Sequence, residues 1–180
     1  MARIPLIDEK QHPELAGEVA KFSAGRRGKL INIYRMLLHS PALADSWFNH
    51  SNAVRWKTAL DGRLREIVII RIGHITKAQY VLRQHVPALA LADGVSIAEC
   101  EALTDWQSAT SFSARERAAL AYADAMTREI AVPDAVFAEV KDHFDTREIV
   151  ELTVLIGSYN MNARVLQALE LDLEPLPARM

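Results

Sequence analysis

The chain has 180 residues, of which half are hydrophobic and about a quarter are charged, as in ordinary globular proteins. Its 21 Lys and Arg residues are balanced by 23 Asp and Glu residues, so there is no basic excess that would favour nucleic acid. The start, MARIPLIDEK, lacks the apolar core of a signal peptide, and the longest uncharged run, LTVLIGSYNMNA at 152–163, is far shorter than the ~20 residues of a membrane span. We therefore expect a cytoplasmic protein that binds neither nucleic acid nor membranes.

Apolar residues recur at helical spacing along the chain, whereas strand patterns are almost absent, so the sequence predicts an all-α fold. Residues 1–39, with the polar stretch SAGRRGK at 23–29, are predicted to form a helical or extended segment that wraps the bundle or contacts another subunit. A helical domain is expected over 40–170, followed by a C-terminal tail at 171–180.

Capping patterns locate the helix starts within that domain. Pro41 opens a helix at the position where its missing amide hydrogen costs nothing, and the next helix begins near Asp61. The patterns SIAE at 96–99, SARE at 113–116 and DTRE at 145–148 each place a capping oxygen three residues before a glutamate. Three further helices are therefore predicted to start there.

Two other boundaries follow from glycine and proline. The helix that contains His85 is predicted to run to Gly94, because ADG at 92–94 places a glycine where a left-handed residue ends a helix. Pro133 is predicted to open a short helix to about Phe144. The β-branched run IVII at 67–70 could be a strand, but its capped start and the length of the pattern favour a helix buried on all sides.

The sequence REIV occurs twice, at 65–68 and at 147–150, and each copy opens a long apolar tract. This echo suggests an internal two-helix repeat in a pseudo-symmetric bundle. Only the first copy is followed by a histidine at the corresponding place, His85, which makes the first unit the candidate for chemistry.

Glu66 and His85 are the candidate acid and base. If a short link near residues 76–78 lets two helices fold back on each other, the two side chains meet inside the bundle. Ala78, Val81 and His85 share one face of the second helix, since they are separated by three and four residues.

The spacing of these residues resembles a known family. Glu66 is followed after eleven residues by Ala78, after two more by Val81 and after three more by His85. This spacing is similar to the motif of the carboxymuconolactone decarboxylase and alkylhydroperoxidase D (AhpD) superfamily. The resemblance covers roughly residues 40 to 170. It includes the segment at and after the histidine, HVPALALADGVSIAECEAL, and the tail LIGSYNMNARVLQALELDLEP. It implies an AhpD-like multi-helix bundle that assembles as a homo-oligomer, a trimer or a multiple of one.

In the redox members of that superfamily the first and second positions are the cysteines of a CxxC pair. Here they are Ala78 and Val81, and Cys100 is the only cysteine, so a thiol peroxidase with a resolving thiol is not expected. The decarboxylase branch also lacks the pair. Its resemblance implies a small cyclic acid or lactone as substrate, with catalytic roles for Glu66 and His85 and with no metal or organic cofactor.

Such a substrate needs groups that hold its carboxylate. Arg83 and Arg71 are the candidates because guanidinium groups bind carboxylates bidentately, and Tyr80 and His74 are candidate hydrogen-bond donors. The remaining histidines show no ligand-like spacing, so no metal site is predicted.

Structural roles compete with these assignments. Glu66 could pair with Arg71 or cap its own helix, and His85 could be an ordinary buried histidine. The stretch SYNMNAR at 158–164 either lines the same cavity or forms a polar seam between subunits. The alternative function is a non-catalytic or ligand-binding helical oligomer of the same fold, and a peroxiredoxin-like alkylhydroperoxidase is the least favoured.

Overall fold

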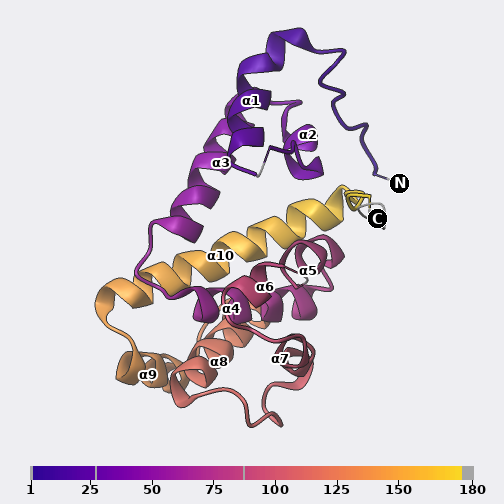
Figure 1. The fold of residues 1–180 in the computed structure, drawn as a ribbon. Helices are drawn as coiled ribbons and strands as arrows, with labels where there is room; N and C mark the ends of the chain where they lie inside the picture. Colours follow the sequence, from indigo (N-terminus) through magenta and orange to yellow (C-terminus); the bar gives the residue numbers. More distant parts are fainter. Residues whose placement is uncertain (1, 27, 87, 176–180) are drawn as a thin grey trace. The chain divides into compact units, whose positions relative to one another are not determined.

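The structure, a computed structural model, describes residues 2–26, 28–86 and 88–175, and this part of the chain contains helices and no strand (Figure 1). The predicted all-α fold is confirmed. None of the helices in the described part is long and apolar enough to cross a membrane. The elements are, in chain order, η1 (Pro13–Leu15), α1 (Ala16–Ala24), α2 (Asn32–Leu37), α3 (Pro41–Trp56), α4 (Gly62–Thr76), α5 (Gln79–His85), α6 (Leu89–Ala92), α7 (Ile97–Ala102), η2 (Leu103–Asp105), α8 (Ala114–Arg128), α9 (Asp134–His143) and α10 (Thr146–Ala168).

The chain forms two compact units, one of residues 1–52 with 165–180 and the other of residues 53–164. Their boundaries fall inside α3 and α10, so each of these helices contributes to both units.

The first unit has an aromatic core of its own. The ring centroids of Phe22 and Tyr34 are 4.9 Å apart, and Phe48 lies 5.1 Å from Phe22 and 5.6 Å from Tyr34. Near the N-terminus the backbone N–H of Arg3 donates to the carbonyl of Leu169 at 2.9 Å. The start of the chain is thereby tied to the residues that follow α10.

The second unit is built around α4. Every residue from Leu64 to Gly73 is buried, and α4 packs against α5, α8 and η2. The Asp61 side chain caps the helix by accepting a hydrogen bond from the N–H of Leu64 at 2.8 Å. The apolar run in this helix is buried on every side, as the sequence predicts.

The three predicted capping boxes are confirmed. Ser96 and Ser113 accept from the N–H groups of Glu99 and Glu116, whose carboxylates accept in turn from the two serine N–H groups. The Asp145 side chain accepts from the N–H of Glu148, and Glu148 accepts from the N–H of Asp145. The starts of α7, α8 and α10 are therefore fixed by local chemistry.

Two of these capping glutamates also form ion pairs with Arg63 of α4. Arg63 donates from Nη2 to Glu99 at 2.6 Å and from Nε to Glu116 at 2.7 Å. The hydrogen bond from Arg63 is the main reason that the pKa of Glu99 is lowered to about 2. One guanidinium group thus joins the starts of α4, α7 and α8.

A tight turn folds α5 back on α4. Lys77 has a φ of 55°, a left-handed conformation that costs a non-glycine residue roughly 1 kcal/mol, and the next N–H, of Ala78, donates to the carbonyl of Gly73 at 2.9 Å. Gly73 permits the close approach, because a Cβ there would lie 2.8 Å from the side chain of Leu82. The predicted reversal near residues 76–78 is confirmed.

The predicted extent of the His85 helix is wrong. The helix α5 ends at His85, and a separate short helix, α6, precedes Gly94, which has the expected left-handed φ of 78°. Pro87 lies outside the described residues, but its position in the sequence explains the interruption, because proline has no amide hydrogen to continue a helix.

The two copies of REIV occupy different positions in their helices. In α4 the cap is Asp61, four residues before Arg65, whereas in α10 the bonds at the helix start involve Asp145, two residues before Arg147. The glutamates differ accordingly: Glu148 completes a cap, whereas Glu66 lies two residues further into its helix and is buried. The echo therefore does not correspond to equivalent roles.

Arg71 forms a buried ion pair between α4 and α8. Its Nε and Nη2 donate to the two carboxylate oxygens of Asp124, each at 2.6 Å, and Nη1 donates to the carbonyls of Leu103 and Thr104 at 2.8 and 3.0 Å. The side chain is therefore part of the packing around η2.

We expect Arg71→Ala to lower the free energy of unfolding by roughly 3–5 kcal/mol, because it leaves the Asp124 carboxylate without its buried partner. Urea unfolding at neutral pH measures the loss. The control is Arg147→Ala, because the Arg147 side chain is 67% exposed and its ion pair with Glu151 is screened by solvent and contributes little. Equal losses in the two variants would contradict this account of Arg71.

Candidate functional site

Glu66 and His85 meet inside the second unit. The Nδ1 of His85 lies 2.6 Å from the Oε2 of Glu66, and the residues are 4% and 0% exposed. Glu66 lies on α4 and His85 is the last residue of α5, so the turn at Lys77 brings them together. The structure thus pairs the two residues that the sequence singles out.

Two arginines flank the other oxygen of Glu66. The Nη2 of Arg55 donates to Oε1 at 3.2 Å, and the Nε of Arg65 lies 4.0 Å from the same atom. Both guanidinium groups also lie against the ring of Trp56, at 4.8 and 5.2 Å from its centroid. One carboxylate therefore faces an imidazole on one side and two positive charges on the other.

These neighbours set the protonation states. Burial raises the pKa of Glu66, but the hydrogen bond from His85 and the positive charges of Arg55 and Arg65 outweigh it, so the pKa is lowered and the carboxylate is ionised. Burial lowers the pKa of His85; Glu66 opposes this, and the two arginines add to it. The imidazole is therefore neutral at pH 7, with its proton on Nδ1 and donated to Glu66.

Tyr159 of α10 contacts the other nitrogen of the imidazole. Its hydroxyl oxygen lies 3.3 Å from the Nε2 of His85, and the two rings meet edge to face, with centroids 5.4 Å apart. Because a neutral imidazole with its proton on Nδ1 accepts at Nε2, the hydroxyl is the donor. Carboxylate, imidazole and phenol thus form one chain of hydrogen bonds.

The two positions that carry cysteines in redox members of the resembled family contain no sulfur. Ala78 and Val81 are 1% and 5% exposed and lie at the start of α5. Cys100 is 2% exposed on α7, and its pKa is raised by burial and by the charges of Glu99 and Glu66. A buried thiol with a raised pKa is a poor nucleophile.

The other residues that the sequence proposed for substrate binding lie elsewhere or are engaged in the fold. The guanidinium group of Arg71 is occupied by Asp124 and two carbonyls. The Nε2 of His74 donates to the carbonyl of Cys100 at 3.0 Å. Tyr80 is buried on α5, two residues after the Ala78 position. Arg83 lies two residues before His85, about 200° around the helix from it, and therefore on another face.

Sequence reasoning missed Arg55, Arg65 and Tyr159. Arg65 directly precedes Glu66, but consecutive residues on a helix do not face each other, so no spacing pattern pairs their side chains. Arg55 comes from the preceding helix, and only the fold places it at Glu66. Tyr159 belongs to SYNMNAR, which was predicted to line a cavity or a subunit seam.

Only part of SYNMNAR contacts the pair. Asn160 donates to the hydroxyl of Thr127 at 2.9 Å and to the carbonyl of Ile156 at 3.1 Å, and it accepts from Arg164 at 2.8 Å. These bonds account for the asparagine as a buried structural residue. Tyr159 is the member of the stretch that reaches His85.

Residues 2–26, 28–86 and 88–175 contain no group of three or more His, Cys, Asp and Glu side chains that could hold a metal ion.

Comparison with known proteins places the chain in a family. The model of the carboxymuconolactone decarboxylase family matches residues 41–125, which contain Glu66 and His85. The uncharacterized protein YnjA of Escherichia coli K12 is 30% identical over 124 residues, which are 68% of this chain and 67% of that protein. The chain belongs to the carboxymuconolactone decarboxylase and AhpD superfamily.

Solved structures share its fold. An alkylhydroperoxidase AhpD core from Ralstonia eutropha JMP134, an uncharacterized peroxidase-related protein, has a TM-score of 0.82 at 16% identity and covers 96% of this chain and 92% of its own. The debrominase Bmp8 has a TM-score of 0.79 at 18% identity, covering 94% and 90%. A cysteine-to-alanine variant of Bmp8 has also been solved in complex with 2,3,4-tribromopyrrole. At these identities the likeness shows the fold alone.

The lowered pKa values of His85 and Glu66 predict that acid destabilises the protein. The unfolded chain protonates His85 near its ordinary pKa of 6.5, whereas the folded chain does so only at lower pH. The contribution of the neutral His85 to the free energy of unfolding is therefore complete above pH 6.5, and it is lost as the pH falls through the pKa of His85 in the folded chain. Glu66 adds a loss of the same sign below its ordinary value of 4.5.

We expect the free energy of unfolding to decrease between about pH 7.5 and pH 5.5, and to decrease less in a His85→Gln variant. Urea unfolding at several pH values measures both. His50→Gln is the control, since His50 is exposed. A wild type whose free energy of unfolding increases as the pH falls from 7.5 to 5.5 would contradict the neutral state of the buried imidazole.

Proposed function

We propose that the protein is a cofactor-free acid–base enzyme of the carboxymuconolactone decarboxylase type, which acts on a small cyclic carboxylic acid or lactone. The observation that carries this proposal is the buried hydrogen-bonded chain of Glu66, His85 and Tyr159. A neutral imidazole whose Nδ1 proton is held by an ionised carboxylate is the usual arrangement of a general base that acts at Nε2.

Each member of the chain has a separate task. The Nε2 of His85 accepts a proton, and Glu66 stabilises the imidazolium that forms and fixes the orientation of the ring. The Tyr159 hydroxyl, which donates to Nε2 in the free protein, is the group that a substrate would displace or hydrogen-bond. Burial keeps the resting imidazole neutral because it lowers the pKa of His85, and the charges of the two arginines add to this effect.

A decarboxylation fits these groups without a thiol. When carbon dioxide leaves, the electron pair of the broken C–C bond passes into a conjugated carbonyl of the substrate, and the carbon then takes up one proton. In this scheme a water molecule supplies that proton through the Nε2 of His85, and the hydroxide that remains combines with the released carbon dioxide to give hydrogencarbonate. The residues return to their starting states after one turnover.

The family membership and the missing cysteines support this branch of the superfamily. Ala78 and Val81 offer no sulfur for peroxide or disulfide chemistry, and Cys100 is buried with a raised pKa. The debrominase Bmp8 binds a small planar ring in the same fold. That ligand has the size of the cyclic substrates that we propose here.

We expect His85→Ala and Glu66→Gln each to lower the rate on a cyclic acid substrate by roughly 10² or more, the usual scale of general acid–base catalysis. The double variant should lose little more than either single one, because the two residues act as one unit. Turnover of a panel of muconolactone-like and other small cyclic acids measures these rates. Near-wild-type rates in both single variants would contradict the proposal.

Two controls accompany this experiment. Circular dichroism of each variant checks that the helical fold survives. Cys100→Ser should leave the rate unchanged, and the wild type should reduce organic hydroperoxides no faster than this cysteine-free protein. Dithiol-dependent peroxide reduction that disappears in Cys100→Ser would favour the peroxidase alternative.

The second candidate function is a non-catalytic, ligand-binding helical protein of the same fold. The burial of the pair favours it, because Glu66 is 0% and His85 4% exposed and a substrate must displace covering side chains to reach Nε2. A panel without turnover, together with saturable binding of a cyclic acid, would support this alternative.

We further propose that the chain assembles as a homo-oligomer, a trimer or a multiple of one. Val150, Val154 and Met161 of α10 are 58%, 44% and 39% exposed and share one helix face, and an oligomer would cover such a stripe. Light scattering at micromolar concentration should give at least three chain masses. A monomer would contradict the assembly but not the chemistry of Glu66 and His85.

A further inference from the structure

The reactive nitrogen of the buried imidazole is covered by a phenol. The Tyr159 hydroxyl lies 3.3 Å from the Nε2 of His85, whereas the Nδ1 of the same ring lies 2.6 Å from Glu66. The first distance is long for a hydrogen bond and the second is short, so the carboxylate holds the ring firmly and the phenol holds it loosely. Nε2 has a single lone pair, and this hydroxyl faces it. A proton that reaches or leaves Nε2 therefore passes through the hydroxyl, unless the phenol moves aside.

The packing around Tyr159 opposes a movement of its ring. Tyr159 is 6% exposed, and its ring meets the imidazole edge to face, with centroids 5.4 Å apart. One turn before and one turn after it on α10, Leu155 and Ala163 are 0% and 1% exposed. Because protein interiors are densely packed, a phenol that swings away from this place leaves a cavity in the core. Displacement of the whole ring is therefore unfavourable.

The hydroxyl can carry a proton while the ring stays in place. A phenol hydroxyl has one proton to donate and two lone pairs that accept. Beside the neutral imidazole it donates to Nε2, and beside the imidazolium it accepts from the Nε2–H. Rotation about the C–O bond of the phenol exchanges the two arrangements. This exchange moves one hydrogen atom and leaves the packing of the core unchanged.

We propose that Tyr159 is a catalytic residue, the relay through which the proton passes between the Nε2 of His85 and the substrate. This inference rests on the proposed function for the reaction, and it names the phenol oxygen, in place of Nε2, as the atom that touches the substrate. The imidazole then stays covered throughout the reaction, which agrees with its burial at 4% exposure. Glu66, His85 and Tyr159 act in that order, from the core outward to the substrate.

Each transfer leaves the hydroxyl as it began. When water supplies the proton, the phenol oxygen accepts it while the phenol's own proton passes to Nε2, and hydroxide remains. When carbon dioxide has left, the phenol gives its proton to the substrate carbon while its oxygen accepts the proton from Nε2. The hydroxide combines with the carbon dioxide to give hydrogencarbonate. Carbon therefore gains one proton, and Tyr159 and His85 return to their starting states.

Tyr159→Phe tests the relay, because it removes the hydroxyl and keeps the ring. On a cyclic acid that the wild type turns over, we expect kcat to fall roughly 10²-fold with little change in KM, since the hydroxyl acts in proton transfer. The double variant that combines Tyr159→Phe with His85→Ala should lose little more than His85→Ala alone, because the two residues act as one unit. Losses that multiply in the double variant would overturn the relay.

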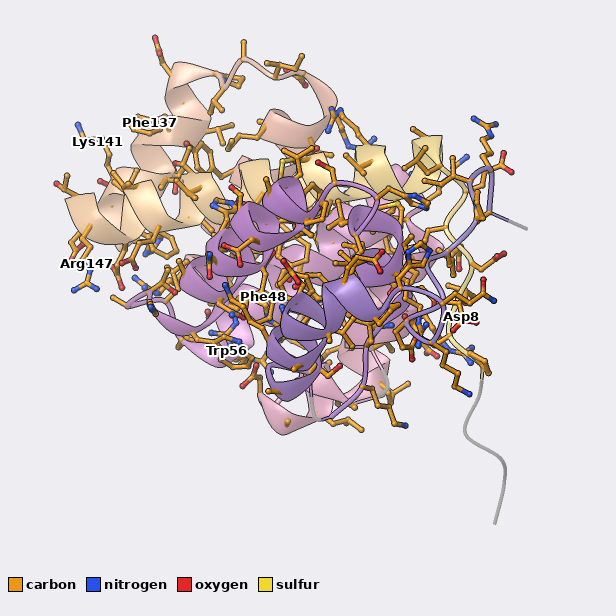
Figure 2. All side chains as sticks on the ribbon, turned by 90° about the horizontal axis from the view of Figure 1, so that it is seen from above. Asp8, Phe48, Trp56, Phe137, Lys141 and Arg147 are labelled. Carbon is orange, nitrogen blue, oxygen red and sulfur yellow. The ribbon has the colours of Figure 1, made fainter. Side chains whose placement is uncertain are left out.

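Tyr122→Phe is the matched control. Tyr122 is also buried, its hydroxyl lies 2.9 Å from that of Thr153 on α10, and its ring packs against Phe137 at the surface of the unit (Figure 2). This substitution breaks a hydrogen bond to the same helix without touching His85, so kcat should stay close to that of the wild type. Equal losses in the two tyrosine variants would overturn the relay, because they would show a general effect on α10.

A measurement without turnover tests the hydrogen bond on which the relay depends. In ¹⁵N NMR at pH 7, the Nε2 signal of His85, assigned by its loss in His85→Gln, should change in Tyr159→Phe and stay in place in Tyr122→Phe. The physical reason is that an unprotonated ring nitrogen responds to the loss of its donor. An unchanged Nε2 signal in Tyr159→Phe would overturn the relay, whatever the rates are.

The outcome for Tyr159 is separable from the outcome for the pair of Glu66 and His85. A rate in Tyr159→Phe that equals or exceeds that of the wild type, together with a loss in His85→Ala, would overturn the relay alone, because the substrate would then react at Nε2 directly. Wild-type rates in His85→Ala and Glu66→Gln would contradict the proposed function itself.

Discussion

Glu66 is an ionised carboxylate with no exposed surface, and burying such a charge costs several kcal/mol unless partners replace the lost water. Those partners are an imidazole on one oxygen and two guanidinium groups on the other, and they come from α3, α4 and α5. The helices must therefore be held in one arrangement for the charge to be tolerated. The proposed proton transfer at His85 would depend on this one carboxylate.

Much of the fold could be predicted from the sequence because its signals are local. Ser96, Ser113 and Asp145 each form the predicted cap with a glutamate three residues later, and Asp61 caps α4. Such bonds involve neighbours in the chain, so a short pattern determines them. The end of the His85 helix was predicted wrongly because the glycine pattern at 92–94 was assigned to that helix, whereas it follows the separate helix α6.

The candidate site was only partly predictable, because its members come from separate helices. The glutamate and histidine were found through spacing that resembles a family, together with the expected reversal between two helices. The choice of arginines depended on which ones the fold turns toward Glu66. Arg71 and Arg83 have the right chemistry, yet a buried carboxylate on α8 occupies the first and the helical turn directs the second elsewhere. Burial and long-range packing decide such roles, and a single sequence does not contain them.

The most direct test of the central claim is the protonation state of His85, observed by ¹⁵N NMR of the imidazole in the full-length protein at pH 7. The account predicts a proton on Nδ1, hydrogen-bonded to Glu66, with Nε2 unprotonated, and a clear change of the Nδ1–H signal in Glu66→Gln. A doubly protonated ring at pH 7, or a proton on Nε2 alone, would contradict the assignment of His85 as a neutral base held by a buried carboxylate.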